Sequence, residues 1–197
     1  MAETMNRASQ DDAPLSTANN ERQAIDEATD GLIVQRGDKL VARAVTINRP
    51  RAELYAFWRD FNNLPSVLDN VVRIEVLDRA RSHWVVKSPG GGIVEWDSRI
   101  TEDREGELIA WASEEGADIP NSGRIEFRDA GARGTVVVAT INYDQPFGTL
   151  GRVISRIFQR EPKMQAQRDL RRFKQLMETG EVATSARTRK QLEEERS

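Results

Sequence analysis

Apolar and polar residues alternate along the middle of the chain with a period of two, the spacing typical of half-buried β-strands. We expect a first strand near Leu40–Ile47, which Asn48-Arg49-Pro50 then ends. Turn signals separate the later strands, whose expected ranges are Val71–Leu77, Trp84–Ser88, Ile93–Thr101, Glu107–Ser113, Gly123–Arg128 and Thr135–Tyr143. The short connections between them predict an antiparallel meander.

The same alternation assigns the sheet one apolar face and one charged face. The inward positions are Val72, Ile74, Val76, Trp84, Val86, Val94, Trp96, Ile100, Ile125, Phe127, Val137, Ala139, Ile141 and Tyr143. The outward positions carry charged or polar residues, among them Arg73, Glu75, His83, Glu95 and Asp97. The strand that ends at Tyr143 alternates least cleanly, and we place its Thr140 and Asn142 outward.

Two stretches instead show the helical period of 3.6 residues. The first follows Pro50 and carries an apolar stripe of Leu54, Phe57, Trp58 and Phe61, with a short second helix or turn from Leu64 to Leu68. The second is C-terminal, and its stripe consists of Leu150, Val153, Ile154, Ile157 and Phe158, then Met164, Gln167, Leu170, Phe173, Leu176 and Met177. Glu161-Pro162 predicts a kink or restart, and Gly180 a stop.

This order of elements predicts an α+β fold in which a strongly curved antiparallel sheet of about seven strands grips a long C-terminal helix. The helix covers the apolar face, and the two short helices after the first strand close one end. Such an arrangement often leaves a cavity between sheet and helix.

Several local motifs point to a known family. They are Thr46-Ile47-Asn48-Arg49-Pro50, Ala56-Phe57-Trp58-Arg59-Asp60-Phe61, Leu64-Pro65, Ser82-His83-Trp84-Val85-Val86-Lys87, Val94-Glu95-Trp96-Asp97, Ile109-Ala110-Trp111, Pro120-Asn121-Ser122-Gly123, Gly134-Thr135 and Asp169-Leu170-Arg171-Arg172-Phe173-Lys174. With the element order, they resemble the START-like (SRPBCC) helix-grip superfamily, in its polyketide cyclase/dehydrase or coenzyme Q-binding-protein-like branch. The resemblance spans about residues 38–180 and implies the fold. It is less specific for function, because this fold hosts lipid carriers, cyclases, hormone receptors and translation-associated proteins.

Composition and charge narrow the classes of function. The 197 residues include no Cys and one His, which excludes a disulfide scaffold, a thiolate nucleophile and a multi-His metal centre. The net charge of −3 is not that of a DNA-binding protein. Residues 1–31 are acidic and 180–197 are polar, so we expect disordered tails flanking a domain at 32–179. No targeting or membrane segment is evident, which favours the cytoplasm.

The candidate ligand contacts are the large or polar side chains expected on the inner surfaces of sheet and helix. They are Trp58, Trp84, Trp96, Trp111, Phe127, Tyr143, Gln167, Leu170 and Phe173. One interpretation is an aromatic-lined cavity for a small hydrophobic molecule such as a lipid, quinone or polyketide-like compound. The alternative is ordinary core packing, in which the indole rings fill the space. Ser88, Ser98 and Ser113 are further inward polar groups.

No residue set predicts a catalytic or metal site, and no cofactor is expected. His83 should point to solvent beside Trp84, and Glu95 and Asp97 share the charged face, where Arg73, Arg99 and Arg124 can neutralise them. Pro89-Gly90-Gly91-Gly92 lacks the residues of a phosphate-binding loop and predicts a hairpin turn, which could gate a cavity.

Three hypotheses about function follow. The first is a binding protein without catalysis. The second is a cyclase or dehydratase acting on a polyketide-like substrate, which requires a titratable group inside the cavity, with Tyr143 or a carboxylate as acid or base. The third is a ribosome- or RNA-associated protein, because residues 147–179 carry a net charge of +5 that could also meet an anionic membrane.

Overall fold

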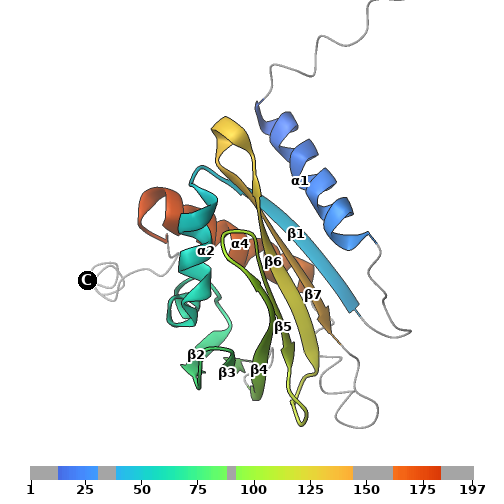
Figure 1. Cartoon of the computed structure of the whole chain (residues 1–197), viewed down its shortest axis with the longest axis vertical. Helices are drawn as coiled ribbons and strands as arrows, with labels where there is room; N and C mark the ends of the chain where they lie inside the picture. The colour runs from blue at the N-terminus through green and yellow to red at the C-terminus, as the bar shows by residue number, and fades with distance from the viewer. Residues whose placement is uncertain (1–12, 31–38, 88–91, 144–161, 183–197) are drawn as a thin grey trace, which may run out of the picture.

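The computed structural model of the chain describes residues 13–30, 39–87, 92–143 and 162–182. These residues form one antiparallel sheet of seven strands, in the order β1-β7-β6-β5-β4-β3-β2. Figure 1 shows helix α4 across one face of the sheet and helix α1 along the other. From β2 to β7 each strand pairs with its neighbour in the chain, so the predicted meander is confirmed. Strand β1 pairs with β7, which leaves β1 and β2 at the two edges of the sheet.

All seven predicted strands are present; Thr135–Tyr143 has the predicted bounds, and each of the others differs at one or both ends. Their bounds are β1 (Lys39–Ile47), β2 (Val71–Val76), β3 (Arg81–Lys87), β4 (Ile93–Arg104), β5 (Leu108–Ser113), β6 (Asn121–Asp129) and β7 (Thr135–Tyr143). The α-helices are α1 (Ala13–Thr29), α2 (Arg51–Arg59) and α4 (Pro162–Thr179), and the 3-10 helices are η1 (Phe61–Ser66) and η2 (Gly131–Arg133).

The motif Asn48-Arg49-Pro50 links β1 and α2 to the far end of α4. Pro50 precedes the first residue of α2, where its missing N–H costs no hydrogen bond. The Arg49 guanidinium donates to the carbonyl oxygens of Met177 (2.7 Å) and Glu178 (3.2 Å). The last carbonyls of a helix lack intrahelical donors, so Arg49 supplies part of the C-terminal cap of α4.

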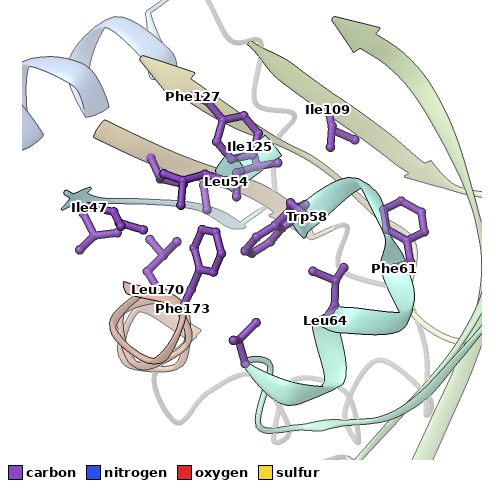
Figure 2. Packing of buried hydrophobic residues seen from close by; sticks show 14 of the residues in the cluster. Ile47, Leu54, Trp58, Phe61, Leu64, Ile109, Ile125, Phe127, Leu170 and Phe173 are labelled. Carbon is purple, nitrogen blue, oxygen red and sulfur yellow. The ribbon is translucent and has the colours of Figure 1, made fainter. Parts of the chain in front are cut away.

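The main core lies between the concave face of the sheet, α2 and α4 (Figure 2). Phe173 of α4 is fully buried, and its ring centroid lies 5.2 Å from those of both Phe57 and Trp58 on α2. Leu54, Ile125 and Phe127 pack in the same cluster, as the predicted stripe and alternation require. These contacts fix the C-terminal half of α4 against α2 and the sheet.

Helix α1 corrects the prediction of a disordered tail at residues 1–31, because Ala13–Thr29 of that stretch are helical, while residues 1–12 lie outside the described residues. Ala24 and Ala28 pack on Val136 and Val138, on the face of β7 opposite the main core. The Glu21 carboxylate accepts hydrogen bonds from the Thr46 backbone N–H (2.8 Å) and hydroxyl (3.1 Å). The sequence of this stretch suggested disorder because it has few large apolar residues. The face of α1 that contacts the sheet consists instead of alanines and of charged side chains with partners.

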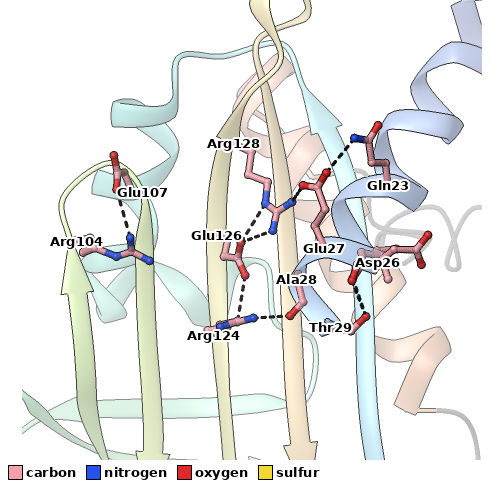
Figure 3. Close-up of polar contacts among 11 residues, drawn as sticks. Gln23, Asp26, Glu27, Ala28, Thr29, Arg104, Glu107, Arg124, Glu126 and Arg128 are labelled. Carbon is pink, nitrogen blue, oxygen red and sulfur yellow. Dashed lines mark hydrogen bonds and ion pairs between the residues drawn. The ribbon is translucent and has the colours of Figure 1, made fainter. Parts of the chain in front are cut away.

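Charged contacts from the convex face of β6 hold the other side of α1 (Figure 3). The Arg128 guanidinium lies 2.7 Å from the Glu27 carboxylate and 2.7 Å from that of Glu126. Arg124 also binds Glu126 and donates to the carbonyl oxygen of Ala28. The outward face of β6 is therefore a docking surface for α1.

This cover explains why β7 alternates poorly in sequence. Val137 and Ala139 face the main core as predicted, while Val136 and Val138 are buried by α1 on the other face. At the opposite edge the prediction was wrong for two side chains: Val72 and Val76 of β2, expected in the core, are 41% and 50% exposed. A register shift between Val71 and Arg73 and the edge position of β2 account for this exposure.

Several predicted features lie outside the described residues. They are Ser88, the turn Pro89-Gly90-Gly91, the stripe from Leu150 to Phe158, and the tail from 183 to 197. Of the C-terminal helix, the part from Pro162 to Thr179 is described, and Gly180 follows it with a positive φ, as expected for a helix stop.

We expect Gly134→Ala to destabilise the fold by about 2–5 kcal/mol. Gly134 has a φ of +89°, and an added Cβ would overlap the backbone of Ile47, Asn48 and Arg49. Left-handed backbone costs about 1–2 kcal/mol for an L-residue, and steric overlap adds about 1–3 kcal/mol. Urea unfolding measures the change. Gly131→Ala is the matched control, because Gly131 has a φ of +61° with open space around it. Equal losses in both variants would contradict the close packing at Gly134.

We expect Ala28→Glu to release α1 while the sheet stays folded, because Ala28 is fully buried against β7. An unpaired carboxylate there costs about 1–3 kcal/mol or more. Hydrogen exchange should then rise in α1 and remain slow in β6 and β7. The exposed Asn20→Glu serves as control and should leave exchange unchanged. Unchanged protection of α1 in Ala28→Glu would show that the helix does not depend on this contact.

Candidate ligand-binding cavity

A cavity of about 260 Å³ lies between the concave face of the sheet, η1 and the N-terminal half of α4. Its wall is predominantly apolar. The lining residues are Trp58, Phe61, Leu64, Leu68, Asn70, Val71, Trp84, Val86, Lys87, Val94, Trp96, Ser98, Ile109, Trp111, Ile119, Asn121, Ala139, Ile141, Tyr143, Gln165, Ala166, Asp169 and Leu170. The volume lies near the lower limit for small-molecule sites, which is roughly 300 Å³.

Three of the four tryptophans come from successive strands. Trp84 on β3 and Trp96 on β4 are direct partners in the register, and their rings stack with centroids 6.2 Å apart and an interplanar angle of 6°. The indole N–H of Trp84 donates to the Ser82 hydroxyl (2.9 Å), and Phe61 meets the ring of Trp84 edge-on at 6.0 Å. These contacts fix the orientation of the stacked pair at the cavity wall.

Trp111 on β5 lies over a glycine of the next strand. Trp111 and Gly123 are register partners, and a Cβ on Gly123 would come within 2.6 Å of the indole ring and of the Thr140 carbonyl oxygen. The absence of a side chain at Gly123 lets the ring lie close to the sheet. Gly123 is the last residue of the family motif Pro120-Asn121-Ser122-Gly123. Its missing side chain therefore leaves room for Trp111 at the cavity wall.

The nine predicted ligand contacts have three outcomes in the structure. Six of them line the cavity: Trp58, Trp84, Trp96, Trp111, Tyr143 and Leu170. Phe127 and Phe173 belong to the closed core instead. Gln167 is not among the lining residues, and Gln165 takes the place expected for it. Successive helical residues are rotated by about 100°, so the face of α4 that carries Gln165, Ala166, Asp169 and Leu170 turns Gln167 aside.

Asp169 is a lining residue that the sequence reasoning missed. Its Oδ1 accepts hydrogen bonds from the Asp69 backbone N–H (3.3 Å) and the Gln165 side-chain amide (2.9 Å). Burial is the main cause that raises the pKa of Asp169 to about 6, and the charge of Asp69 adds to the rise. The signal was present, because Asp169 lies four residues before Phe173 and therefore on the same helix face.

Tyr143 at the end of β7 shares this wall. Burial raises the pKa of its hydroxyl to about 12, and the negative charge of Asp169 contributes. Asn121, another lining residue, is hydrogen-bonded within the protein: its side-chain amide donates to the Ile119 carbonyl (2.9 Å), and its backbone N–H donates to the Ser113 hydroxyl (3.0 Å). The cavity thus combines an aromatic wall with a titratable pair at α4 and β7.

His83 lies on the outer face, as predicted, and takes no part in the cavity. Its Nδ1 is 2.7 Å from Asp97 and its Nε2 is 3.5 Å from Glu95. The arginines expected to neutralise these carboxylates pair elsewhere: Arg73 with Glu75, Arg99 with Glu114 and Arg124 with Glu126. Sequence periodicity therefore predicted which face of the sheet these side chains occupy, but it did not predict their ion-pair partners.

The basic residues of α4 are partly used within the fold. Arg172 binds Asp69 (2.8 Å), and Lys174 donates to the Thr46 carbonyl oxygen (2.6 Å) and lies 3.5 Å from Glu178. Arg168 and Arg171 are exposed. Arg152, Arg156 and Arg160, which contributed to the predicted basic surface, lie outside the described residues.

In the described part of the chain, no group of three or more His, Asp or Glu side chains is arranged to hold a metal ion. No helix of these residues is long and apolar enough to cross a membrane.

Comparisons with known proteins agree with this architecture. Residues 47–171 match the family described as polyketide cyclase/dehydrase and lipid transport. A crystal structure from Deinococcus radiodurans is similar with 41% identity and a TM-score of 0.59, covering 73% of this chain and 100% of that chain. An aromatase/cyclase of a Streptomyces species matches at 16% identity and a TM-score of 0.58, covering 74% and 99% of the two chains. A START superfamily protein of Mycobacterium smegmatis matches at 14% identity and a TM-score of 0.56, covering 70% and 98%.

We expect Asp169→Asn to stabilise the protein at neutral pH by about 1–2 kcal/mol. The pKa of Asp169 is raised from 3.8 to about 6 on folding, so the folded state resists ionisation. Stability therefore falls as the pH rises from about 4 to about 6, and stays level above that range. Asp169→Asn has no carboxyl to ionise at this position and does not lose this stability. The difference in free energy of unfolding between the two proteins should therefore vanish near pH 4.

Urea unfolding at several pH values measures the effect. Asp129→Asn is the control, because Asp129 is exposed and its Oδ1, which accepts from the Gly131 N–H, is retained in Asn. The raised pKa of Asp169 would be refuted if both variants changed stability equally at every pH.

Proposed function

The chain belongs to the polyketide cyclase/dehydrase and lipid transport family, and on this basis we propose that it binds a small hydrophobic molecule between sheet and helix. The observation that carries the proposal is the cavity of about 260 Å³ whose wall is formed by four tryptophans and aliphatic side chains. Rings that filled this space would have left no cavity. Contacts of Trp84 with Ser82 and Phe61, and of Trp111 with Gly123, fix these rings at the wall and support a lined rather than a filled interior.

Burial supplies the binding energy in this proposal. Each 100 Å² of apolar ligand surface removed from water contributes about 2.5 kcal/mol. Flat rings suit the wall, because aromatic pairs add about 0.5–1.5 kcal/mol beyond burial when they stack or meet edge-on. The modest volume favours a compact aromatic, quinone or polyketide-like compound over a lipid with two long chains.

A cyclase or dehydratase activity is the second candidate, and a specific observation favours it. The hypothesis required a titratable group inside the cavity, and Asp169 lines it with a pKa raised to about 6. A carboxyl with a pKa near the working pH can both accept and donate a proton. The test is whether a linear polyketide mimic is converted by the protein but only bound by Asp169→Asn. Binding without conversion in both would leave the binding function alone.

We expect Ala139→Leu to weaken binding of a neutral apolar probe, N-phenyl-naphthylamine, by about tenfold or more. Ala139 on β7 lines the cavity, and three added carbons occupy space that the probe needs. Probe fluorescence at equilibrium measures the affinity, and native mass spectrometry of the purified protein shows whether a molecule already occupies the site. The fold should persist, because the added atoms enter a cavity.

The control for this substitution is Ala132→Leu, at an exposed alanine of η2 outside the cavity. It adds the same atoms at the surface and should leave the affinity unchanged. If both variants bind the probe like the unaltered protein, the probe does not enter this cavity, and the proposed function loses its support.

A further inference from the structure

Asp169 stands out among the cavity residues because it is the one carboxylate on the wall that the structure describes. Both of its hydrogen bonds, from Asp69 and Gln165, end on Oδ1. Among the described residues no hydrogen bond reaches Oδ2. One carboxylate oxygen thus remains as an acceptor on the wall of a predominantly apolar cavity.

The neighbouring charges leave Asp169 without a counter-ion in the described part of the chain. The positive charge of Arg172 lowers the pKa of Asp169, but its guanidinium forms an ion pair with Asp69 at 2.8 Å. Asp69 itself adds negative charge beside the site. Lys87 also lines the cavity, but its side chain is exposed and it forms no ion pair with Asp169 there. Tyr143 has a raised pKa and stays neutral at physiological pH.

This arrangement restricts the head group of a ligand. A wholly apolar molecule that filled the cavity would strip water from Asp169 and leave its charge unpaired, which is costly. A ligand carboxylate would add like-charge repulsion. A protonated amine would instead supply the missing counter-charge and a charge-assisted hydrogen bond to Oδ2.

The aromatic wall favours the same class. The face of an indole ring attracts cations, and Trp is the strongest of the aromatic side chains in this respect. Four indoles share the wall with Asp169, including the stacked pair of Trp84 and Trp96. Resting on the proposed function, we infer that the cavity selects a hydrophobic amine: a compact, ring-bearing body with one protonated nitrogen that pairs with Asp169.

Three probes with one common ring system test this inference: naphthylmethylamine, naphthalenemethanol and naphthoate. Their bodies are nearly identical, and their head groups are a cation, a neutral hydroxyl and an anion. Isothermal titration calorimetry near neutral pH should place the amine tightest and naphthoate weakest, with a gap of about tenfold or more between amine and alcohol.

The variant Asp169→Asn should remove most of this preference, because it lowers the affinity for the amine and relieves the repulsion of naphthoate. The control Asp129→Asn removes an exposed carboxylate outside the cavity and should retain the full ranking. The affinity for the amine should also fall as the pH drops below about 6, where Asp169 takes up a proton. The ranking of the three probes is measured on the unaltered protein. A folding defect in Asp169→Asn therefore cannot obscure that part of the result.

The outcomes separate the two proposals. Equal affinity for all three probes, or a preference for the amine that survives in Asp169→Asn, overturns the selection of an amine and leaves the binding function standing. No binding of any of the three overturns the binding function at this cavity, and the selection of an amine with it.

Discussion

The contact of Phe173 with Phe57 and Trp58 determines how the rest of the molecule is arranged. It clamps the C-terminal half of α4 to α2, with ring centroids 5.2 Å apart in both pairs. Arg49 reinforces the clamp by capping the last carbonyls of α4. Trp58 belongs to this closed core and also to the cavity wall, so one side chain marks where packing ends and open space begins. The N-terminal half of α4 is thereby held over the sheet without filling the gap beneath it.

The tryptophans on the sheet keep that gap open. An indole can fill a core or lie along its wall, and the choice depends on what supports the ring. Trp84 and Trp96 stack on each other as cross-strand partners, and Trp111 lies over Gly123. The titratable groups of the cavity wall include Asp169 on α4 and Tyr143 at the end of β7. An apolar wall facing one carboxylate gives the cavity both affinity for rings and a basis for selecting head groups.

Sequence patterns predicted the sheet well, because a period of two depends on burial of one face and needs no knowledge of partners. They also predicted that Trp84, Trp96 and Trp111 point inward. Three failures have physical causes. Helix α1 packs through alanines that carry little hydropathy signal. Val72 is exposed by a local register shift. Asp169 is a polar residue on an apolar helix face, and a stripe defined by apolar residues does not include it.

The most direct test of this account is whether the space among the indoles is real and apolar. A crystal of the protein pressurised with xenon answers this without knowledge of the ligand, because dry apolar cavities bind xenon. We predict a xenon site between Trp84, Trp111 and Ala139, with the rings remaining against the sheet. No xenon there, with the indole rings turned inward to fill the space, would contradict the account.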